Sequence, residues 1–184
     1  MKIKYQQSGF SLIEVLITVV ILATGLLSIT GLQLNSVKAS HNALMKTQAR
    51  YIATTLLDKI RANPQALSDY LVDGATFTCP VSAPTPTCVS VATSTTACTA
   101  TQLATSEKHL AICGHTVSGV VNGGVKNELP SASMTIQCIK TDGTFSSTAT
   151  DCATRNVGIS ISWGERNLNS GAITSNSLRI TGSI

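Results

Sequence analysis

The chain divides into an apolar run, an amphipathic stretch and a polar remainder. The apolar run covers residues 10–34, which are 25 residues with one ionisable side chain, Glu14. As a helix rising ~1.5 Å per residue it would be roughly 37 Å long, enough to cross a hydrocarbon core of ~30 Å. The pattern predicts a membrane-spanning helix with one acid near its start. An acid in such a segment is costly and therefore indicates a function.

The helical pattern continues past the apolar run. Apolar residues recur at spacings of three, four and eight, which predicts an amphipathic helix with one buried stripe. The stripe consists of Val37, Met45, Ala49, Ile52, Ala53, Leu56, Leu57 and Ile60. Asn63-Pro64 ends the helix, because the residue before a proline is pushed out of the helical region. One helix over residues 10–62 is expected.

The remainder begins with loops and ends with strands. Prolines and Thr/Ser-rich sequence over residues 64–100 predict loops, with a possible helical turn at 68–72 and a helix at 99–112. The predicted helix places Leu103, Ala104, Leu110 and Ala111 on one side. Asn122-Gly123-Gly124 interrupts regular structure after this helix.

Three later segments alternate apolar and polar residues, as strands with one covered face do. Their apolar positions are Met134, Ile136 and Cys138, then Val157, Ile159, Ile161 and Trp163, then Leu178 and Ile180. Asp142-Gly143 and Asn169-Ser170-Gly171 supply turns between them. The expected fold class is α+β: a long N-terminal helix packed on a small antiparallel sheet head with disulfide-stapled loops.

Charge and ligand residues narrow the function. The formal charge is +4, and Lys2 and Lys4 contribute two of these charges, so 4 − 2 = 2 remain beyond Gly9. That balance, without basic runs, argues against nucleic acid as a partner. No C-x-x-C occurs and His109 and His115 lack paired ligand spacing, so we expect no metal and no cofactor.

Six cysteines lie in the polar remainder, an even number that favours disulfides in an oxidising compartment. They are Cys79, Cys88, Cys98, Cys113, Cys138 and Cys152. Six cysteines allow 15 connectivities. We expect Cys79–Cys88 and Cys138–Cys152 to close local loops, which leaves Cys98–Cys113.

The segment Gly9-Phe10-Ser11-Leu12-Ile13-Glu14 resembles the type IV prepilin signature. The resemblance implies that an inner-membrane prepilin peptidase cuts between Gly9 and Phe10 and methylates the new N-terminus at Phe10. Glu14 then matches the family's glutamate. A buried carboxylate needs a partner, and the new amine of a neighbouring subunit is a plausible one.

More of the chain is similar to the minor pilins of the PilV type. The similarity rests on residues 21–27, 31–33 and 56–64, on Gln102-Leu103-Ala104 and on Leu129-Pro130. Gly31 departs from the helix-kinking proline of many major pilins. Residues between Ala104 and Leu129 lack the Asp and Trp expected in this branch.

The resemblance implies a domain order and a function. We expect a basic leader at 1–9, an assembly helix at 10–34, a stem helix at 35–63 and a head at 64–184. The positive charges of the leader keep it on the cytoplasmic side, so the head is expected to be exported. The resemblance implies that the head lies in the periplasm of a Gram-negative bacterium before the protein enters a cell-surface pilus. The expected function is a minor pilin that primes or caps type IV pilus assembly, with prepilin peptidase and other minor and major pilins as partners.

Four alternatives remain open. The chain could be a minor pseudopilin of a type II secretion system, or a pilus-tip subunit for adhesion or DNA uptake that presents the loops at Cys79–Cys98. An exported enzyme is disfavoured, because Ser94, His109 and Asp142 are isolated and no nucleophile–base motif surrounds them. A secreted protein with an ordinary cleaved signal peptide is also disfavoured, because such a signal ends in a small-x-small cleavage site and none is obvious after the apolar run.

Overall fold

The computed structural model describes residues 11–73, 77–79, 84–85, 88, 97–117, 120–166 and 172–184. The chain forms two compact units, Met1–Leu44 and Met45–Ile184. Helix α1, Leu12–Ala62, runs through both units. The predicted helix over 10–62 is therefore confirmed from Leu12 onward, and residue 10 lies outside the described residues. At the far end, the Asn63 N–H still donates to the carbonyls of Lys59 and Ile60, and Pro64 then starts a different turn.

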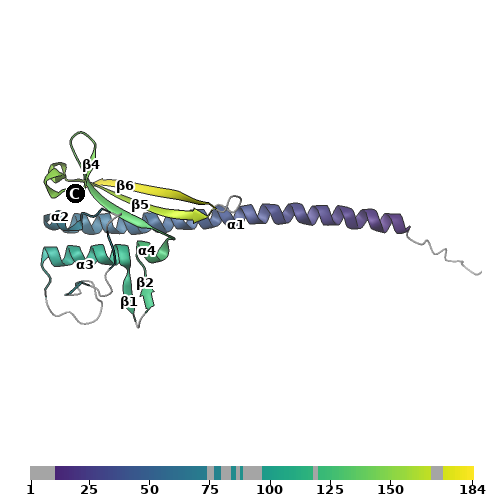
Figure 1. Cartoon of the computed structure of the whole chain (residues 1–184), viewed down its shortest axis with the longest axis horizontal. Coiled ribbons are helices and arrows are strands. Elements are labelled where there is room, and N and C mark those ends of the chain that lie inside the picture. Colours follow the sequence, from purple (N-terminus) through teal and green to yellow (C-terminus); the bar gives the residue numbers. More distant parts are fainter. Residues whose placement is uncertain are drawn as a thin grey trace, which may run out of the picture. The chain divides into compact units, whose positions relative to one another are not determined.

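The second unit contains a four-stranded antiparallel sheet (Figure 1). Its strands are β3 (Ser133–Ile139), β4 (Phe145–Ser146), β5 (Asn156–Arg166) and β6 (Ile173–Ser183), in the order β4-β3-β5-β6. The three alternating segments are confirmed as β3, β5 and β6. The two-residue strand β4 was not predicted. The Asp142-Gly143 turn is confirmed, with Gly143 at φ +80°, whereas the predicted turn at 169–171 lies outside the described residues.

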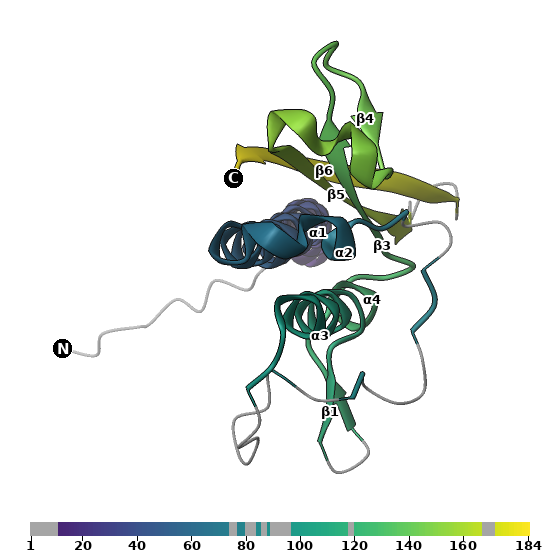
Figure 2. The same ribbon diagram turned by 90° about the vertical axis from the view of Figure 1, so that its left-hand side faces the viewer.

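From Met45 onward, α1 lies between this sheet and helix α3, Ala100–Cys113 (Figure 2). Helix α3 begins with a capping box, in which Thr99 and Gln102 each satisfy the other's backbone N–H. The short elements η1 (Pro64–Ala66) and α2 (Leu67–Tyr70) connect α1 to the rest. Helix α4, Val125–Glu128, comes directly after the Gly-Gly break.

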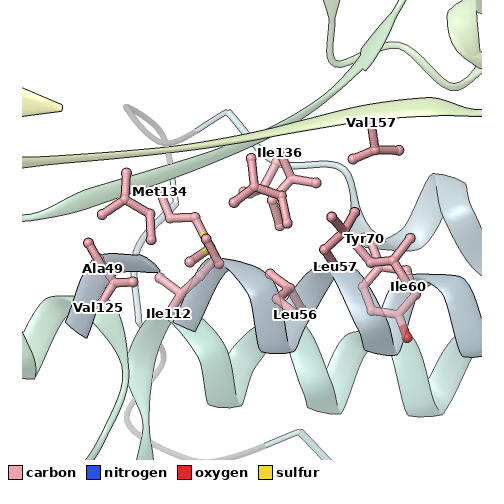
Figure 3. Packing of buried hydrophobic residues seen from close by; sticks show 14 of the residues in the cluster. Ala49, Leu56, Leu57, Ile60, Tyr70, Ile112, Val125, Met134, Ile136 and Val157 are labelled. Carbon is pink, nitrogen blue, oxygen red and sulfur yellow. The ribbon is translucent and has the colours of Figure 1, made fainter. Parts of the chain in front are cut away.

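The hydrophobic core lies between the sheet, α1 and α3 (Figure 3). The predicted stripe on α1 is confirmed for the second unit, where its fully buried members are Ala49, Ala53, Leu56, Leu57 and Ile60. Val37 is 68% exposed, so the buried stripe does not extend into the first unit. Strand residues that face α1, such as Ile136 and Ile159, are fully buried.

The predicted apolar side of α3 is partly wrong. Ala104 is buried as expected, but Leu103, Leu110 and Ala111 are only partly buried. The buried face includes Ser106, Glu107, Ile112 and Cys113 instead. The reason is that α3 packs against Tyr70 of α2, whose hydroxyl provides a polar partner for a buried carboxylate.

A small hairpin, β1 (His115–Val117) paired with β2 (Val120–Asn122), was not predicted. Glycines at positive φ hold its base, where a Cβ on Gly114 would lie 2.2 Å from the Gly123 carbonyl oxygen and one on Gly124 would lie 2.2 Å from the Gly114 nitrogen. The Asn127 side chain reinforces this contact by donating to the carbonyls of Cys113 and Gly123 at 2.7 and 2.9 Å. The hairpin depends on backbone contacts and therefore leaves little trace in the hydrophobic pattern.

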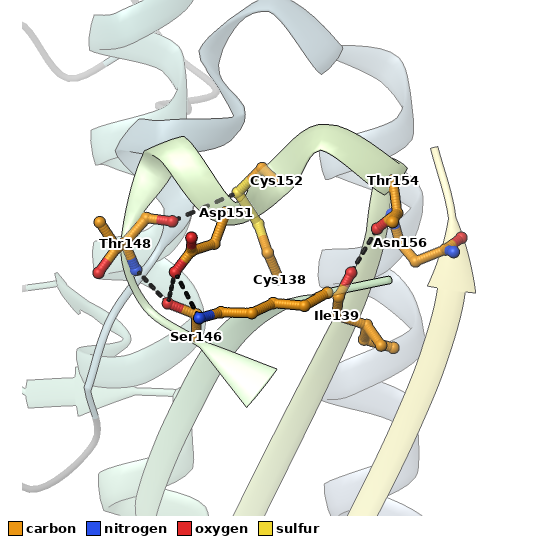
Figure 4. The surroundings of a disulfide bond; sticks show 9 residues. Cys138, Ile139, Ser146, Thr148, Asp151, Cys152, Thr154 and Asn156 are labelled. Atoms are coloured by element: carbon orange, nitrogen blue, oxygen red, sulfur yellow. Dashed lines mark hydrogen bonds and ion pairs between the residues drawn. A yellow bond between two sulfur atoms is a disulfide. The ribbon is translucent and has the colours of Figure 1, made fainter. Parts of the chain in front are cut away.

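All six cysteines form disulfides: Cys79–Cys113, Cys88–Cys98 and Cys138–Cys152. The prediction of Cys138–Cys152 is confirmed, and those of Cys79–Cys88 and Cys98–Cys113 are wrong. Sequence proximity favours local pairs, but α3 carries Cys113 to Cys79 across 34 residues. Around Cys138–Cys152, Asp151 accepts from Ser146 at 2.5 Å and pairs with Lys140 at 3.1 Å, which joins β4 to the 3₁₀ helix η2, Ala149–Thr154 (Figure 4).

Candidate assembly site

The predicted cleavage and methylation residues, Gly9 and Phe10, lie outside the described residues. The described part begins one residue later. The Ser11 carbonyl accepts from the N–H groups of Glu14 and Val15 at 3.0 and 3.4 Å, which starts the first turn of α1. A carboxylate in a first helical turn is favoured by the helix dipole, so Glu14 is compatible with this position.

Exposed apolar side chains surround Glu14. Leu12, Ile13, Leu16 and Ile17 are each more than half exposed. α1 is long and apolar enough to cross a membrane, and it is the one helix of the described residues that meets this criterion. Its most apolar window is not buried within the chain at all. Soluble proteins rarely expose so large an apolar surface, which indicates that lipid or other protein covers this segment.

The hydroxyl side chains of this segment are already satisfied. Thr18, Thr24, Ser28 and Thr30 each donate to a helix carbonyl three or four residues earlier, at 2.8–3.0 Å. Such bonds allow Ser and Thr to lie in an apolar environment. Among residues 12–32, Glu14 is the remaining polar side chain, and its carboxylate has no hydrogen bond or ion pair to the described residues.

The chain offers Glu14 no cation nearby on the helix. The next lysine or arginine is Lys38, 38 − 14 = 24 residues further along α1. At ~1.5 Å per residue the two lie roughly 36 Å apart, far beyond an ion pair. A partner for the carboxylate must therefore come from residues before Ser11 or from another molecule.

Gly25 and Gly31 lie within the continuous helix. A Cβ at either position would meet nothing within 4 Å. Packing inside the chain therefore gives no reason for glycine at these sites. Small residues in apolar helices allow close approach of a neighbouring helix, which is the remaining physical reason for them.

The second unit contains a buried polar cluster that was not predicted from the sequence. The fully buried Tyr70 hydroxyl donates to Glu107, and the Asn63 amide donates to the Ala100 carbonyl at 2.8 Å. Burial, together with the bond to Glu107, raises the pKa of Tyr70 well above its ordinary value. The cluster ties the end of α1 to α2 and α3. The signal in the sequence was Glu107, which lies three or four residues from Leu103, Ala104, Leu110 and Ala111 on the predicted helix. A carboxylate among apolar neighbours indicates a buried polar contact.

The three isolated residues considered for catalysis do not form a site. Ser94 lies outside the described residues. Asp142 accepts from the Thr144 N–H and hydroxyl at 2.8 and 2.6 Å, so it holds a turn, and these bonds lower its pKa. His109 is on α3, where burial lowers its pKa, and its Nε2 has no hydrogen-bond partner in the part of the chain that the structure describes. Within the described residues, no group of His, Cys, Asp and Glu could hold a metal ion.

The architecture is that of an α+β protein with a long apolar-to-amphipathic helix packed on an antiparallel sheet. Two family models match adjoining parts of the chain. The prokaryotic N-terminal methylation motif matches residues 4–30, and the family described as type IV pilin Tt1218 matches residues 31–107. By these matches, residues 4–107 are similar to type IV pilins and to their N-terminal methylation motif, and the α+β fold is consistent with that family. Type IV pilins are structural subunits rather than enzymes. No curated protein and no solved structure matches the chain.

Proposed function

We propose that the chain is a minor pilin of the PilV type that primes or caps the assembly of type IV pili. Prepilin peptidase removes residues 1–9 and methylates Phe10. Before assembly, the head lies in the periplasm of a Gram-negative bacterium. The main supporting observation is Glu14, whose carboxylate has no partner among the described residues and lies in an exposed apolar helix, within the segment that matches the methylation motif.

The unpaired carboxylate supports a mechanism for assembly. A charge in an apolar environment is stabilised by an opposite charge at hydrogen-bonding distance. The new amine at Phe10 of a neighbouring subunit is such a partner, and pairing with Glu14 would fix the axial position of the entering subunit. Close helix approach at Gly25 and Gly31 would support the same contact.

The test separates processing from assembly. Gly9→Val should leave the leader attached, because the peptidase needs a small residue before the cut. Glu14→Ala should be cut and methylated normally but fail to enter pili, and Glu14→Asp, which keeps the charge, should retain part of the assembly. Intact-mass measurement reports processing, and immunoblotting of sheared pili reports assembly.

The outcomes distinguish the candidates. Normal incorporation of the Glu14→Ala protein would refute the ion-pair mechanism. Loss of about thirty N-terminal residues, as an ordinary signal peptide would require, would refute the interpretation of residues 1–9 as a prepilin leader. Deletion of the gene should reduce pili, and a loss of protein secretion with normal pili would assign the chain to a type II secretion system instead.

A further inference from the structure

We propose that the free edge of β6 is a docking site for an extended segment of a different protein, which adds to the sheet as a further strand. The site lies entirely within residues 45–184. It stands on the geometry of the head and is independent of the assembly mechanism proposed for Glu14.

The hydrogen-bond register shows which backbone groups of β6 are used by β5. The Ile184 N–H donates to the Arg155 carbonyl at 2.9 Å, so these two residues form a bonded pair. In an antiparallel ladder, bonded pairs alternate with unbonded ones. Gly164 of β5 fits this alternation, since its N–H donates to Pro130 at 2.9 Å, on the side away from β6.

Every second residue of β6 therefore directs its N–H and C=O away from β5. In the interior of the strand, these residues are Ser175, Ser177, Arg179 and Thr181. All four are exposed, and none has a backbone partner within the described part of the chain. Their eight backbone groups form a regular row along the outermost strand of the sheet (Figure 1).

The edge lacks the features that normally prevent strand addition. Such features are prolines, bulges, short strands and charged side chains. β6 has 11 residues, no proline and an unbroken register against β5. Its single charge, Arg179, lies with its guanidinium 4.1 Å from the centre of the Phe145 ring and donates to Ser160 at 2.7 Å. The charge is thereby held over the strand's own sheet and does not block the edge.

The side of β6 that faces the core is incompletely covered. Leu178 and Ile180 are only partly buried, although their partners on β5, Ile161 and Ile159, are fully buried. An added strand with apolar residues at alternate positions on this side would complete the cover. The occupant is therefore an extended segment with alternating apolar and small polar residues.

The charges at the C-terminal end of β6 favour an acidic residue in the occupant. Arg61 donates to the Ser183 carbonyl at 3.1 Å, and the Arg155 carbonyl accepts from the Ile184 N–H at 2.9 Å, so two arginines lie at this end of the strand. Among the contacts of these arginines with the described residues, the one carboxylate is that of Asp58, which pairs with Arg61 at 3.0 Å. If the occupant runs antiparallel to β6, its first residues lie beside the C-terminal end of β6. A carboxylate at the start of the occupant would therefore lie near these arginines.

A second copy of this chain fits the edge less well. Two β6 strands paired about a two-fold axis would match Ser177 with Arg179 and Ser175 with Thr181. The β6 strand contains no acidic residue, so a second β6 would bring no carboxylate to the arginines at the C-terminal end of the edge. A different protein is therefore the occupant.

The test uses a peptide copied from β5, the natural neighbour of β6. A fluorescent peptide with the sequence of residues 156–163, NVGISISW, carries glutamate in place of its first residue. Fluorescence anisotropy measures its binding to the full chain in detergent micelles. We expect binding to the wild type and to Ser177→Ala, and at least tenfold weaker binding to Ser177→Pro, which removes one outward N–H and none of the bonds to β5.

Hydrogen exchange on the wild-type chain provides a second measurement that does not depend on the proline variant. The peptide should slow exchange at the Ser177 and Arg179 amides, whereas the Leu178 and Ile180 amides are protected without it. A control peptide that keeps asparagine as its first residue should bind several-fold more weakly at low salt than the peptide with glutamate at that position.

Four results would overturn the proposal. They are no binding to the wild type, equal binding by the proline and alanine variants, unchanged exchange at Ser177 and Arg179, and a dimer in micelles whose edge amides are protected without peptide. The last result would assign the edge to a second copy. None of these results bears on leader cleavage or on Glu14, so a failure here is distinct from a failure of the proposed function.

Discussion

At the scale of single residues, the hydroxyl of Tyr70 and the carboxylate of Glu107 form the main polar contact inside the head. Both side chains are almost fully buried, and the Tyr70 hydroxyl donates to Glu107. A buried carboxylate that loses its donor retains the desolvation penalty without compensation. The net stabilisation from this hydrogen bond is modest, but removing the Tyr70 hydroxyl would leave the Glu107 carboxylate buried without a donor. The larger energetic effect at the junction of α2 and α3 is therefore this penalty.

Tyr70→Phe tests this contact. The variant should lower the free energy of unfolding by about 1–3 kcal/mol, because Glu107 stays buried without its donor. Tyr51→Phe is the matched control, since Tyr51 is 71% exposed, and its effect should stay within about 0.5 kcal/mol. Urea unfolding in detergent measures both. Equal effects of the two variants would show that the hydroxyl of Tyr70 does not matter.

His109 should make the head sensitive to mild acid. Burial lowers its pKa below the ordinary value of 6.5, so the unfolded chain binds a proton that the folded chain does not. The free energy of unfolding should therefore fall as the pH drops through the range below 6.5. His109→Leu should remove this dependence, and His115→Leu, at an exposed site, should keep it. Urea unfolding at neutral and mildly acidic pH distinguishes these outcomes.

At the scale of elements, the Cys138–Cys152 disulfide secures the end of the sheet. It links β3 to η2 across 14 residues, and β4 lies within the loop that it closes. Replacing both cysteines with alanine should lower the free energy of unfolding by about 3 kcal/mol, if loop closure in the unfolded chain dominates. Replacing Cys79 and Cys113, which close a loop of 34 residues, should cost about 1 kcal/mol more. Thermal unfolding of the two double variants checks the order, and a reversed order would contradict the loop argument.

Elements with a strong hydrophobic period could be predicted from the sequence. The helix α1 and the strands β3, β5 and β6 belong to this group, because each buries one face against the same core. The hairpin β1–β2 could not be predicted, since its base is a backbone contact between Gly114 and Gly124. Strand β4 has two residues, too few to show alternation.

The candidate site and the buried polar contacts could be predicted from the sequence only in part, because some of them depend on tertiary packing. Glu14 is conspicuous because nothing else in the apolar run is ionisable. The Tyr70–Glu107 contact and the Cys79–Cys113 bond depend on where α3 packs, which local sequence does not specify. Residue patterns report the environment of a segment, and they report the identity of its neighbour only when the two are close in the chain.

At the scale of the whole molecule, the core belongs to one of the two compact units. Every buried core residue lies at Ala49 or later, within Met45–Ile184. A chain shortened to begin at Asn35 should therefore be soluble and should unfold at nearly the same temperature as the full chain. Circular dichroism and thermal unfolding measure this. A drop of more than about 5 °C, equivalent to roughly 2 kcal/mol for this size, would show that the apolar half stabilises the head.

The connectivity of the disulfides has a consequence for the order of events during biosynthesis. A chain that leaves the ribosome from its N-terminus presents Cys79 and Cys88 first, well before Cys113. If oxidation kept pace with emergence, these two would join, and the product would be a non-native isomer. The native Cys79–Cys113 and Cys88–Cys98 bonds are nested one inside the other, so they require either delayed oxidation or later reshuffling. A cell that makes this protein should therefore need a disulfide isomerase to obtain it in high yield.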